Sequence, residues 1–290
     1  MTAAAWLAAA AAWWLIRDTV ARRREREFAR AHTFDADGIL AGAQPLTLEG
    51  KRAGAVLLLH GYNDSPQSLH FMAAALHAHG WSVRVPLLPG HGRQLRDWAA
   101  TNADAWESAA REELAALRRS HAAIAVGGLS MGGALAFMLA AENPEVCAVV
   151  GFAPYLHVSL PVELLTLIAP LASLGAKYFS SGGGTSVHDP VASNEMVAYR
   201  CSTPRLAVEL QKLVKHARAA LPSVRQPVLV VQSREDNRIP VASATEAFGL
   251  VGSADKTLHW TTGNGHVVTV DYGHEAIESV TTTWLESRLK

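Results

Sequence analysis

The chain has 290 residues, of which 49% are hydrophobic and 18% are charged, and its formal net charge is zero at pH 7. This length suits one large α/β domain or two small ones, and the composition excludes an intrinsically disordered chain. The balanced charge excludes an electrostatic argument for nucleic acid or for a strongly acidic partner. The two cysteines, Cys147 and Cys201, have no metal-ligand or redox spacing, which is typical of free thiols in a reducing compartment.

The first 30 residues combine an apolar stretch with a basic flank. Residues 2–16 carry no charge and include Trp13 and Trp14, whereas residues 17–30 contain six arginines and three acidic residues. A secretory signal would carry its positive charge before the apolar stretch. The reversed order indicates a membrane-attached helix that keeps its basic flank, and the domain after it, on the cytoplasmic side.

The apolar stretch is short for a membrane span. About 15 residues rise roughly 22 Å in a helix, whereas the hydrocarbon core of a bilayer is about 30 Å thick. We therefore expect residues 1–30 to act as a membrane anchor and keep three arrangements open. The helix can span a thinned bilayer, lie on its surface, or pack as an alanine-rich helix on the protein, which would then be a soluble cytoplasmic protein.

From residue 54 onward, short apolar stretches alternate with helical patterns. We expect strands at residues 54–59, 81–85, 122–126, 146–152, 227–232 and 256–261. We expect helices at residues 66–79, 103–119, 131–142, 241–250 and 274–289. This alternation predicts an α/β fold with a mostly parallel central sheet and helices on both faces.

Residues 153–222 interrupt the alternation. They contain an apolar segment at residues 160–174, three glycines at 182–184 and a helical pattern near residues 204–220. A connection between two strands seldom needs this length. We therefore expect an inserted helical cap at about residues 153–222, within a domain of residues 31–290.

The segment Gly128-Leu129-Ser130-Met131-Gly132 lies between an expected strand and an expected helix. Its G-x-S-x-G pattern alone would occur by chance in about one chain in ten, so its position carries the argument. A sharp strand-to-helix turn leaves no room for side chains at Gly128 and Gly132, and it exposes the serine at the carboxyl edge of the sheet. We therefore predict Ser130 as a nucleophile, against the alternative of a structural serine in a glycine-rich turn.

A serine nucleophile needs a base and a carboxylate that orients the base. His266 follows the last expected strand, and Asp236 follows the strand at 227–232. Both positions lie at carboxyl ends of strands, where doubly wound sheets place their sites. The chain order Ser130, Asp236, His266 is the order used with a nucleophile elbow, so we predict these residues as the catalytic triad.

Other residues compete for two of these roles. His259 and His274 are rivals for the base, but the first falls inside a strand and the second begins a helix. Glu235 is a close rival for the role of the acid, because a shift of one residue in the loop would place it where Asp236 is expected. Asp271 is a weaker rival because it lies so near the base in sequence.

Two backbone N–H groups are predicted to bind the developing oxyanion. His60-Gly61-Tyr62 follows the first strong strand, so the N–H of Tyr62 is one expected donor, and the N–H of Met131, after the nucleophile, is the other. His60 and His91 are interpreted as structural histidines. No HExxH pattern and no glycine-rich phosphate loop occurs in the sequence, so we expect neither a metal nor a cofactor.

Taken together, these motifs resemble those of the α/β-hydrolase superfamily, in its carboxylesterase and monoacylglycerol-lipase-like branch. The matching segments are Leu59-His60-Gly61-Tyr62, Pro89-Gly90-His91-Gly92, Gly128–Gly133, Glu235-Asp236 and Gly265-His266. The resemblance covers about residues 43–288. It implies the α/β-hydrolase fold and a serine hydrolase that cleaves a small-molecule or lipid ester with a hydrophobic acyl group through an acyl-enzyme.

One feature narrows the range of expected ester substrates, while several other activities stay open. An aromatic residue follows His60-Gly61, where some lipases and esterases have a series of glycines, and this difference argues against bulky tertiary-alcohol esters. Thioesterase, amidase and carbon–carbon bond hydrolase activities use the same triad and stay open. A non-catalytic, membrane-tethered interaction protein is the alternative from another class, which the complete set of triad residues disfavours.

Overall fold

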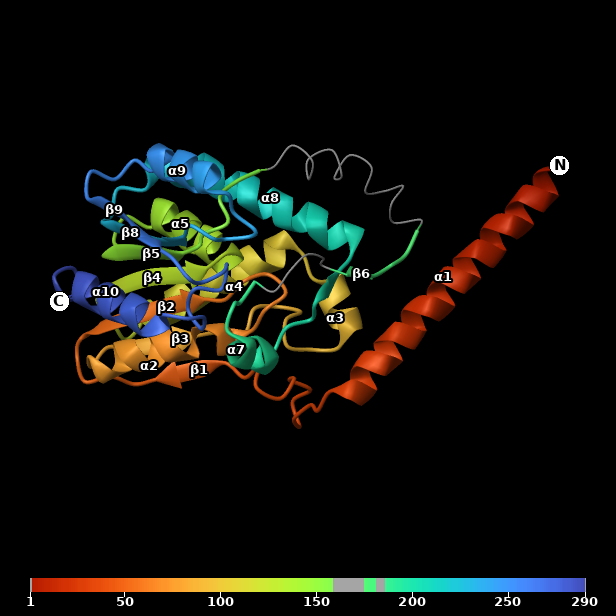
Figure 1. Ribbon diagram of the computed structural model, residues 1–290, viewed down its shortest axis with the longest axis horizontal. Helices are drawn as coiled ribbons and strands as arrows, with labels where there is room; N and C mark the ends of the chain where they lie inside the picture. Colours follow the sequence, from red (N-terminus) through yellow and green to blue (C-terminus); the bar gives the residue numbers. More distant parts are fainter. Residues whose placement is uncertain (1, 159–174, 181–185, 290) are drawn as a thin grey trace.

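A computed structural model describes residues 2–158, 175–180 and 186–289 (Figure 1). Its main sheet has seven strands in the order β1-β3-β2-β4-β5-β8-β9. Only β1 is antiparallel to its neighbour, and every other pairing in this sheet is parallel. The strands are β1 (Leu46–Leu48), β2 (Gly54–Leu59), β3 (Ser82–Val85), β4 (Ala123–Leu129), β5 (Ala148–Phe152), β8 (Val228–Ser233) and β9 (Lys256–Thr261). The predicted α/β class with a mostly parallel sheet is confirmed.

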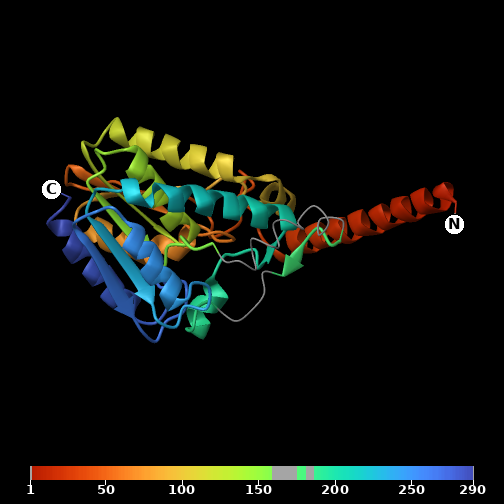
Figure 2. The same cartoon turned by 90° about the horizontal axis from the view of Figure 1, so that it is seen from above.

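Helices cover both faces of this sheet (Figures 1 and 2). One face carries α2 (His70–Ala78) and α10 (His274–Glu286), which contact each other, and the other carries α4 (Ala103–Arg118), α5 (Met131–Glu142), α8 (Pro204–Ala220) and α9 (Val241–Leu250). The remaining elements are α1 (Ala3–Ala31), η1 (Pro66–Leu69), α3 (Leu95–Ala100), β6 (Phe179–Ser180), α7 (Pro190–Glu195), β7 (Cys201–Ser202) and η2 (Leu221–Ser223).

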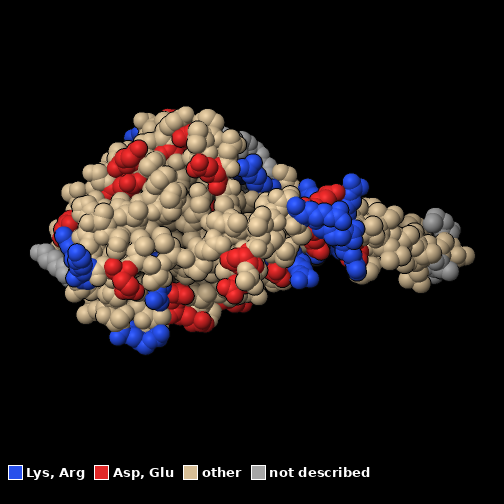
Figure 3. Space-filling model, turned by 90° about the horizontal axis from the view of Figure 1, so that it is seen from below, with Lys and Arg blue, Asp and Glu red and all other residues tan. Residues whose placement is uncertain are grey.

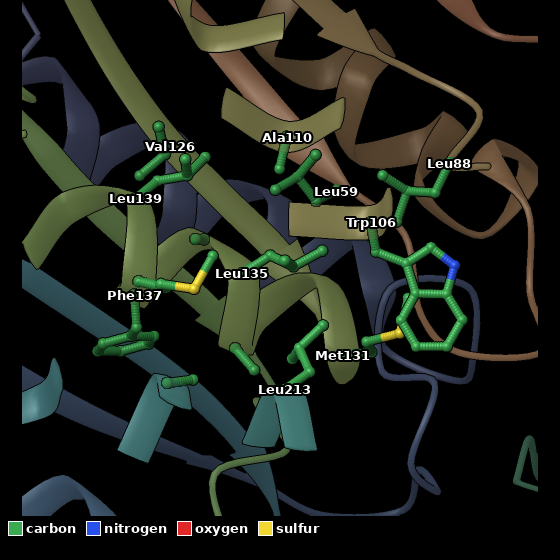
Figure 4. Packing of buried hydrophobic residues seen from close by; sticks show 14 of the residues in the cluster. Leu59, Leu88, Trp106, Ala110, Val126, Met131, Leu135, Phe137, Leu139 and Leu213 are labelled. Carbon is green, nitrogen blue, oxygen red and sulfur yellow. The ribbon is translucent and has the colours of Figure 1, made fainter. Parts of the chain in front are cut away.

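The two covered faces explain why the strands read as continuous apolar stretches. All six residues of β2 are buried, with Leu57 and Leu59 packed on the α5 side and Val56 and Leu58 on the α2 side. Side chains alternate between faces along a strand, so a strand with helices on both sides needs an apolar residue at every position. Figure 4 shows the α5 side of this core, where Met131 lies beside Trp106.

The expected cap insertion is described only in part. The apolar segment at 160–174 and the glycines at 182–184 lie outside the described residues. Within 153–222, β6 and β7 form a small antiparallel pair. The helix expected near residues 204–220 is α8, which packs against α5 and α4 and therefore belongs to the layer that covers the main sheet.

The long helix α1 projects from the side of the molecule that carries α3 and β6 (Figures 1 and 2). Its second half contacts the body: Ala21 is buried, and Glu25 accepts hydrogen bonds from Lys177 Nζ at 2.7 Å and Tyr178 Oη at 2.6 Å. Arg17 Nε donates to the carbonyl oxygen of Gly175 at 2.9 Å. The second half of α1 is therefore docked on residues 175–178.

The first half of α1 is exposed. Its large apolar side chains, which are more than half exposed, are Trp6, Leu7, Trp13, Trp14, Leu15 and Ile16. Figure 3 shows the arginines gathered between this apolar end and the body. Across the part of the chain that the structure describes, no helix has the length and apolar character needed to cross a bilayer.

Candidate active site

Ser130 occupies the sharp turn between the end of β4 and the start of α5. Its backbone has φ 53° and ψ −113°, a positive-φ conformation that few residues other than glycine adopt. Its N–H donates to the carbonyl oxygen of Phe152 at 2.9 Å, and its carbonyl oxygen accepts from Ala134 and Tyr155. These bonds anchor the turn to β5 and to α5, so the strained conformation is held from both sides.

The flanking glycines are required by close backbone contact. A Cβ at Gly132 would lie 1.9 Å from the carbonyl oxygen of Leu59, and a Cβ at Gly128 would lie 2.3 Å from the backbone of Gly132. No side chain fits at such distances. The structure thus gives the physical reason for the G-x-S-x-G spacing that the sequence analysis used.

His266 and Asp236 come together from two different loops. His266 Nδ1 lies 2.8 Å from Asp236 Oδ2, and the two side chains are 10% and 0% exposed. A carboxylate only accepts hydrogen bonds, so Nδ1 carries the proton of a neutral ring and Nε2 is left as its basic nitrogen. Asp236 follows β8 and His266 follows β9, and these strands are parallel neighbours, so both side chains lie at the carboxyl edge of the sheet.

Hydrogen bonds fix the carboxylate of Asp236. Its Oδ1 accepts from the N–H groups of Arg238 at 2.7 Å and Ile239 at 2.9 Å, and its Oδ2 also accepts from Gln232 Nε2 at 2.7 Å. Burial raises the pKa of Asp236, but the hydrogen bond and charge of His266, together with these N–H groups, outweigh burial and hold the pKa below its usual value. Asp236 therefore stays ionised beside His266.

The rival residues point elsewhere. Glu235 is 48% exposed on its side chain, and its Oε1 accepts from the N–H of Gly263. His274 pairs with Glu278 on its own helix at 2.7 Å, and His259 lies within β9. Of the residues that competed for the acid, the structure brings Asp236 into contact with His266.

The two expected oxyanion donors lie at neighbouring strand ends. Leu59, the last residue of β2, is paired in register with Gly128 of β4, so the loop of Tyr62 and the start of α5 at Met131 share one edge of the sheet. The phenol of Tyr62 points away toward Ser202, whose Oγ lies 2.5 Å from Tyr62 Oη. The main-chain role of Tyr62 stays a prediction.

His60 stabilises the loop that carries Tyr62. Its Nδ1–H donates to the carbonyl oxygen of Gly61, and its Nε2 accepts from the N–H of Leu88, both at 3.0 Å. Burial lowers the pKa of His60 to about 4, and burial also lowers the pKa of its neighbour His91 well below the usual value. Both rings are neutral and buried, which fits the structural role assigned to them.

Two buried acidic residues lie near His266. Asp64 was not predicted as a site residue, and Asp271 was considered only as a weak candidate for the triad acid. Asp64 follows the Tyr62 loop, and burial raises its pKa to about 6, against the effects of nearby N–H groups, the Ser68 hydroxyl and His266. Asp271 is fully buried and accepts hydrogen bonds from the main chain around His266. The only signal in the sequence was an acidic residue a few positions after each motif histidine, His60 and His266.

The chain is similar to known proteins over most of its length. Residues 50–272 match the family model described as "Serine aminopeptidase, S33". The chain is 29% identical over 241 residues to a thermostable monoacylglycerol lipase of Bacillus sp. strain H-257, covering 82% of this chain and 92% of that protein. It is 25% identical over 244 residues to a carboxylesterase of Bacillus subtilis strain 168, covering 84% and 96%.

Solved structures of lipolytic enzymes also have a fold similar to that of this chain. A structure from work on the metagenome-derived lipolytic enzymes LipS and LipT superposes with a TM-score of 0.78 at 28% identity, covering 86% of this chain and 100% of that one. The fold is also that of a soluble variant of monoglyceride lipase from Saccharomyces cerevisiae, with a TM-score of 0.70 at 16% identity, covering 85% and 91%. The chain therefore belongs to the α/β-hydrolase superfamily, in the family described as "Serine aminopeptidase, S33", and is an esterase- or lipase-type hydrolase.

Proposed function

We propose that this protein hydrolyses carboxylic esters with a hydrophobic acyl group through a covalent acyl-enzyme on Ser130. The observation that carries the proposal is the buried hydrogen bond between His266 and the ionised Asp236. This pair lies at the edge of the sheet where the strained turn presents Ser130. The similarity to a monoacylglycerol lipase and a carboxylesterase supports an ester as the substrate.

In the proposed first half-reaction, His266 Nε2 takes the proton of Ser130 Oγ while the oxygen attacks the ester carbonyl carbon. Asp236 accepts from Nδ1–H, fixes the tautomer and stabilises the imidazolium that forms. The imidazolium then gives its proton to the departing alkoxide, which leaves as the alcohol. In the second half-reaction, His266 takes a proton from water while the hydroxide attacks the carbonyl carbon of the acyl-enzyme. The bond between this carbon and Ser130 Oγ then breaks, His266 returns its proton to Oγ, and the carboxylic acid leaves with Ser130 regenerated.

The N–H groups of Tyr62 and Met131 are the proposed donors to the tetrahedral oxyanion. Each such donor contributes about 3 to 4 kcal/mol of transition-state stabilisation in serine hydrolases. Met131 begins α5, so the positive end of the helix dipole adds to its N–H. The proposed activity needs no metal ion and no organic cofactor.

The proposal is tested with the purified chain and a panel of p-nitrophenyl esters of increasing acyl length, with a matched thioester and a matched anilide. We expect ester turnover by the wild type, and a loss of about a thousand-fold or more in Ser130→Ala because the acyl-enzyme cannot form. Ser253→Ala is the matched control, because Ser253 is a buried serine whose hydroxyl, among the described residues, donates to the carbonyl oxygen of Asp255 in its own turn. Faster cleavage of the thioester or the anilide would move the substrate class to thioesters or amides, and ester turnover by Ser130→Ala would exclude Ser130 as the nucleophile.

We also propose that the exposed half of α1 holds the enzyme at an anionic membrane surface, with the catalytic domain on the cytoplasmic side. Exposed tryptophans next to an arginine-rich segment are typical of an interfacial helix, whose apolar side chains enter the lipid while the cations face anionic headgroups. Because Arg17, Arg24 and Glu25 bind residues 175–178, a cut at residue 31 would remove contacts with the body as well as the proposed anchor.

Full-length variants therefore test the anchor better than truncation does. We expect wild type to float with vesicles that contain phosphatidylserine, and Trp6→Ser/Trp14→Ser/Ile16→Ser to remain unbound while keeping its activity on a short soluble ester. Val191→Ser/Tyr272→Ser, which removes exposed apolar side chains outside α1, is the matched control. Equal flotation of the triple variant and wild type would refute the anchor.

A further inference from the structure

Asp271 is a buried carboxylate that the mechanism above does not use. It has no exposed surface, and four backbone N–H groups donate to it. Its Oδ2 accepts from Gly265 at 2.7 Å and His188 at 2.8 Å. Its Oδ1 accepts from Asp189 at 2.9 Å and Tyr272 at 2.8 Å. Charge-assisted bonds of this kind in a dry site are among the stronger ones in proteins.

These four donors belong to two chain segments that meet beside the proposed base. Gly265 immediately precedes His266, whereas His188 and Asp189 come from the segment that leads into α7. The same two segments are also joined by the Val267 N–H, which donates to the carbonyl oxygen of Ser186 at 3.0 Å. Hydrogen bonds therefore fix the main chain on both sides of His266.

Close packing accompanies these bonds. A Cβ at Gly265 would lie 2.6 Å from the carbonyl oxygen of Ser186, so glycine is needed for the two segments to approach. His266 itself lies in a loop between β9 and α10. The Asp236 carboxylate fixes its ring through Nδ1, but it does not fix the main chain on which the ring is mounted.

We propose that Asp271 is a positioning residue for the reaction, one that holds the His266 backbone against Ser186–Asp189 so that Nε2 meets Ser130 Oγ. The proposal rests on the proposed function of Ser130 and His266. Displacement of a catalytic group by about 1 Å costs on the order of a hundred-fold in rate, so rigid support of this loop has a direct kinetic value.

Asp271→Asn tests the proposal. The amide replaces one acceptor oxygen by an NH₂ group, which then faces two backbone N–H donors whichever way it is turned. We expect kcat per active site to fall about 10- to 100-fold, as for a displaced catalytic group, while KM for a short-chain ester stays within about three-fold. Active sites are counted from the stoichiometry of irreversible fluorophosphonate labelling at completion, so that unfolded protein does not enter kcat.

This normalisation separates positioning from mere stability. A purely structural residue would lower the labelled fraction and leave kcat per labelled site unchanged, and that result would overturn the proposal. Glu107→Gln is the matched control, because Glu107 is also a buried carboxylate but lies on α4 and binds Arg111 and His216. It should keep kcat per site within about two-fold of wild type, as expected for a change away from the reacting groups.

A second variant covers the case in which Asp271→Asn does not fold. Gly265→Ala keeps the carboxylate but forces the loop away from Ser186, so it should show the same fall in kcat per site with little change in KM. Wild-type kcat per site in this variant would then refute the proposal. A wild-type chain that is neither labelled nor active would instead refute the proposed function, so the two failures are distinct.

Discussion

Asp64→Asn should stabilise the fold at neutral pH but not at pH 4. Asp64 is 6% exposed, and among the described residues its Oδ1 has no hydrogen-bond partner. Burial raises the pKa of its carboxyl from the ordinary 3.8 to about 6, although the Ser68 hydroxyl, the N–H groups of Ser65 and Gly61 and the charge of His266 act in the opposite direction. The fold therefore favours the protonated form of this side chain.

The sign of the pH dependence follows from this raised pKa. Protonated Asp64 contributes stability that is fully present below about pH 4 and is lost as pH rises through about 6. The change in pKa corresponds to about 3 kcal/mol, which wild type loses by pH 7.5. Asparagine stays neutral and avoids this loss, but its amide bonds the surrounding groups less well. We therefore expect a net gain of about 1 to 3 kcal/mol at pH 7.5, which is about 2 to 5 °C in Tm for a domain of this size.

The assay is the Tm difference between Asp64→Asn and wild type, measured by scanning calorimetry from pH 4 to pH 8. The difference should be near zero or negative at pH 4 and should grow to its full value above pH 7. Asp37→Asn, an exposed aspartate, is the control and should show no such trend. A Tm difference that is independent of pH, or that falls as pH rises, would refute the reasoning from burial.

Four further substitutions test the site. Asp236→Asn should lower kcat by about 10²- to 10⁴-fold because the imidazolium loses its carboxylate, whereas Glu235→Gln should keep most of the activity; the reverse order in steady-state kinetics would make Glu235 the acid. Gly132→Ala should give little folded protein, because its Cβ would lie 1.9 Å from the carbonyl oxygen that ends β2; a wild-type circular dichroism spectrum and Tm would contradict this. Tyr62→Phe should keep kcat near wild type and lose about 1 kcal/mol of unfolding free energy with its bond to Ser202; a kcat lowered more than about ten-fold, a loss typical of a removed transition-state contact, would mean that the hydroxyl takes part.

The main strands could be predicted because burial on both faces leaves a plain apolar pattern. No such pattern marks β1, a strand of three residues at the edge of the sheet with half-exposed side chains. The helices α3 and α7 were not predicted either, because they have six residues each and are too short to show a helical period. Short elements depend on their tertiary surroundings more than on local sequence.

The candidate triad could be predicted because each member follows a strand of the same parallel sheet. The choice between Glu235 and Asp236 could not, because one residue of turn geometry after β8 decides which carboxylate turns inward to His266. The role proposed for Asp271 could not be predicted from the sequence, because its partners are four backbone N–H groups, which no side-chain pattern reveals. Contacts of α1 with the carbonyl groups of Gly175 and Tyr178 were hidden in the same way.

The measurement that tests the central claim most directly is labelling with a fluorophosphonate, followed by intact-mass and peptide mass spectrometry. We predict one adduct per chain, located on Ser130, with complete loss of ester hydrolysis in proportion to labelling. Ser130→Ala and His266→Ala should remain unlabelled under the same conditions. Absence of an adduct on wild type, or an adduct on another residue with activity retained, would contradict the account.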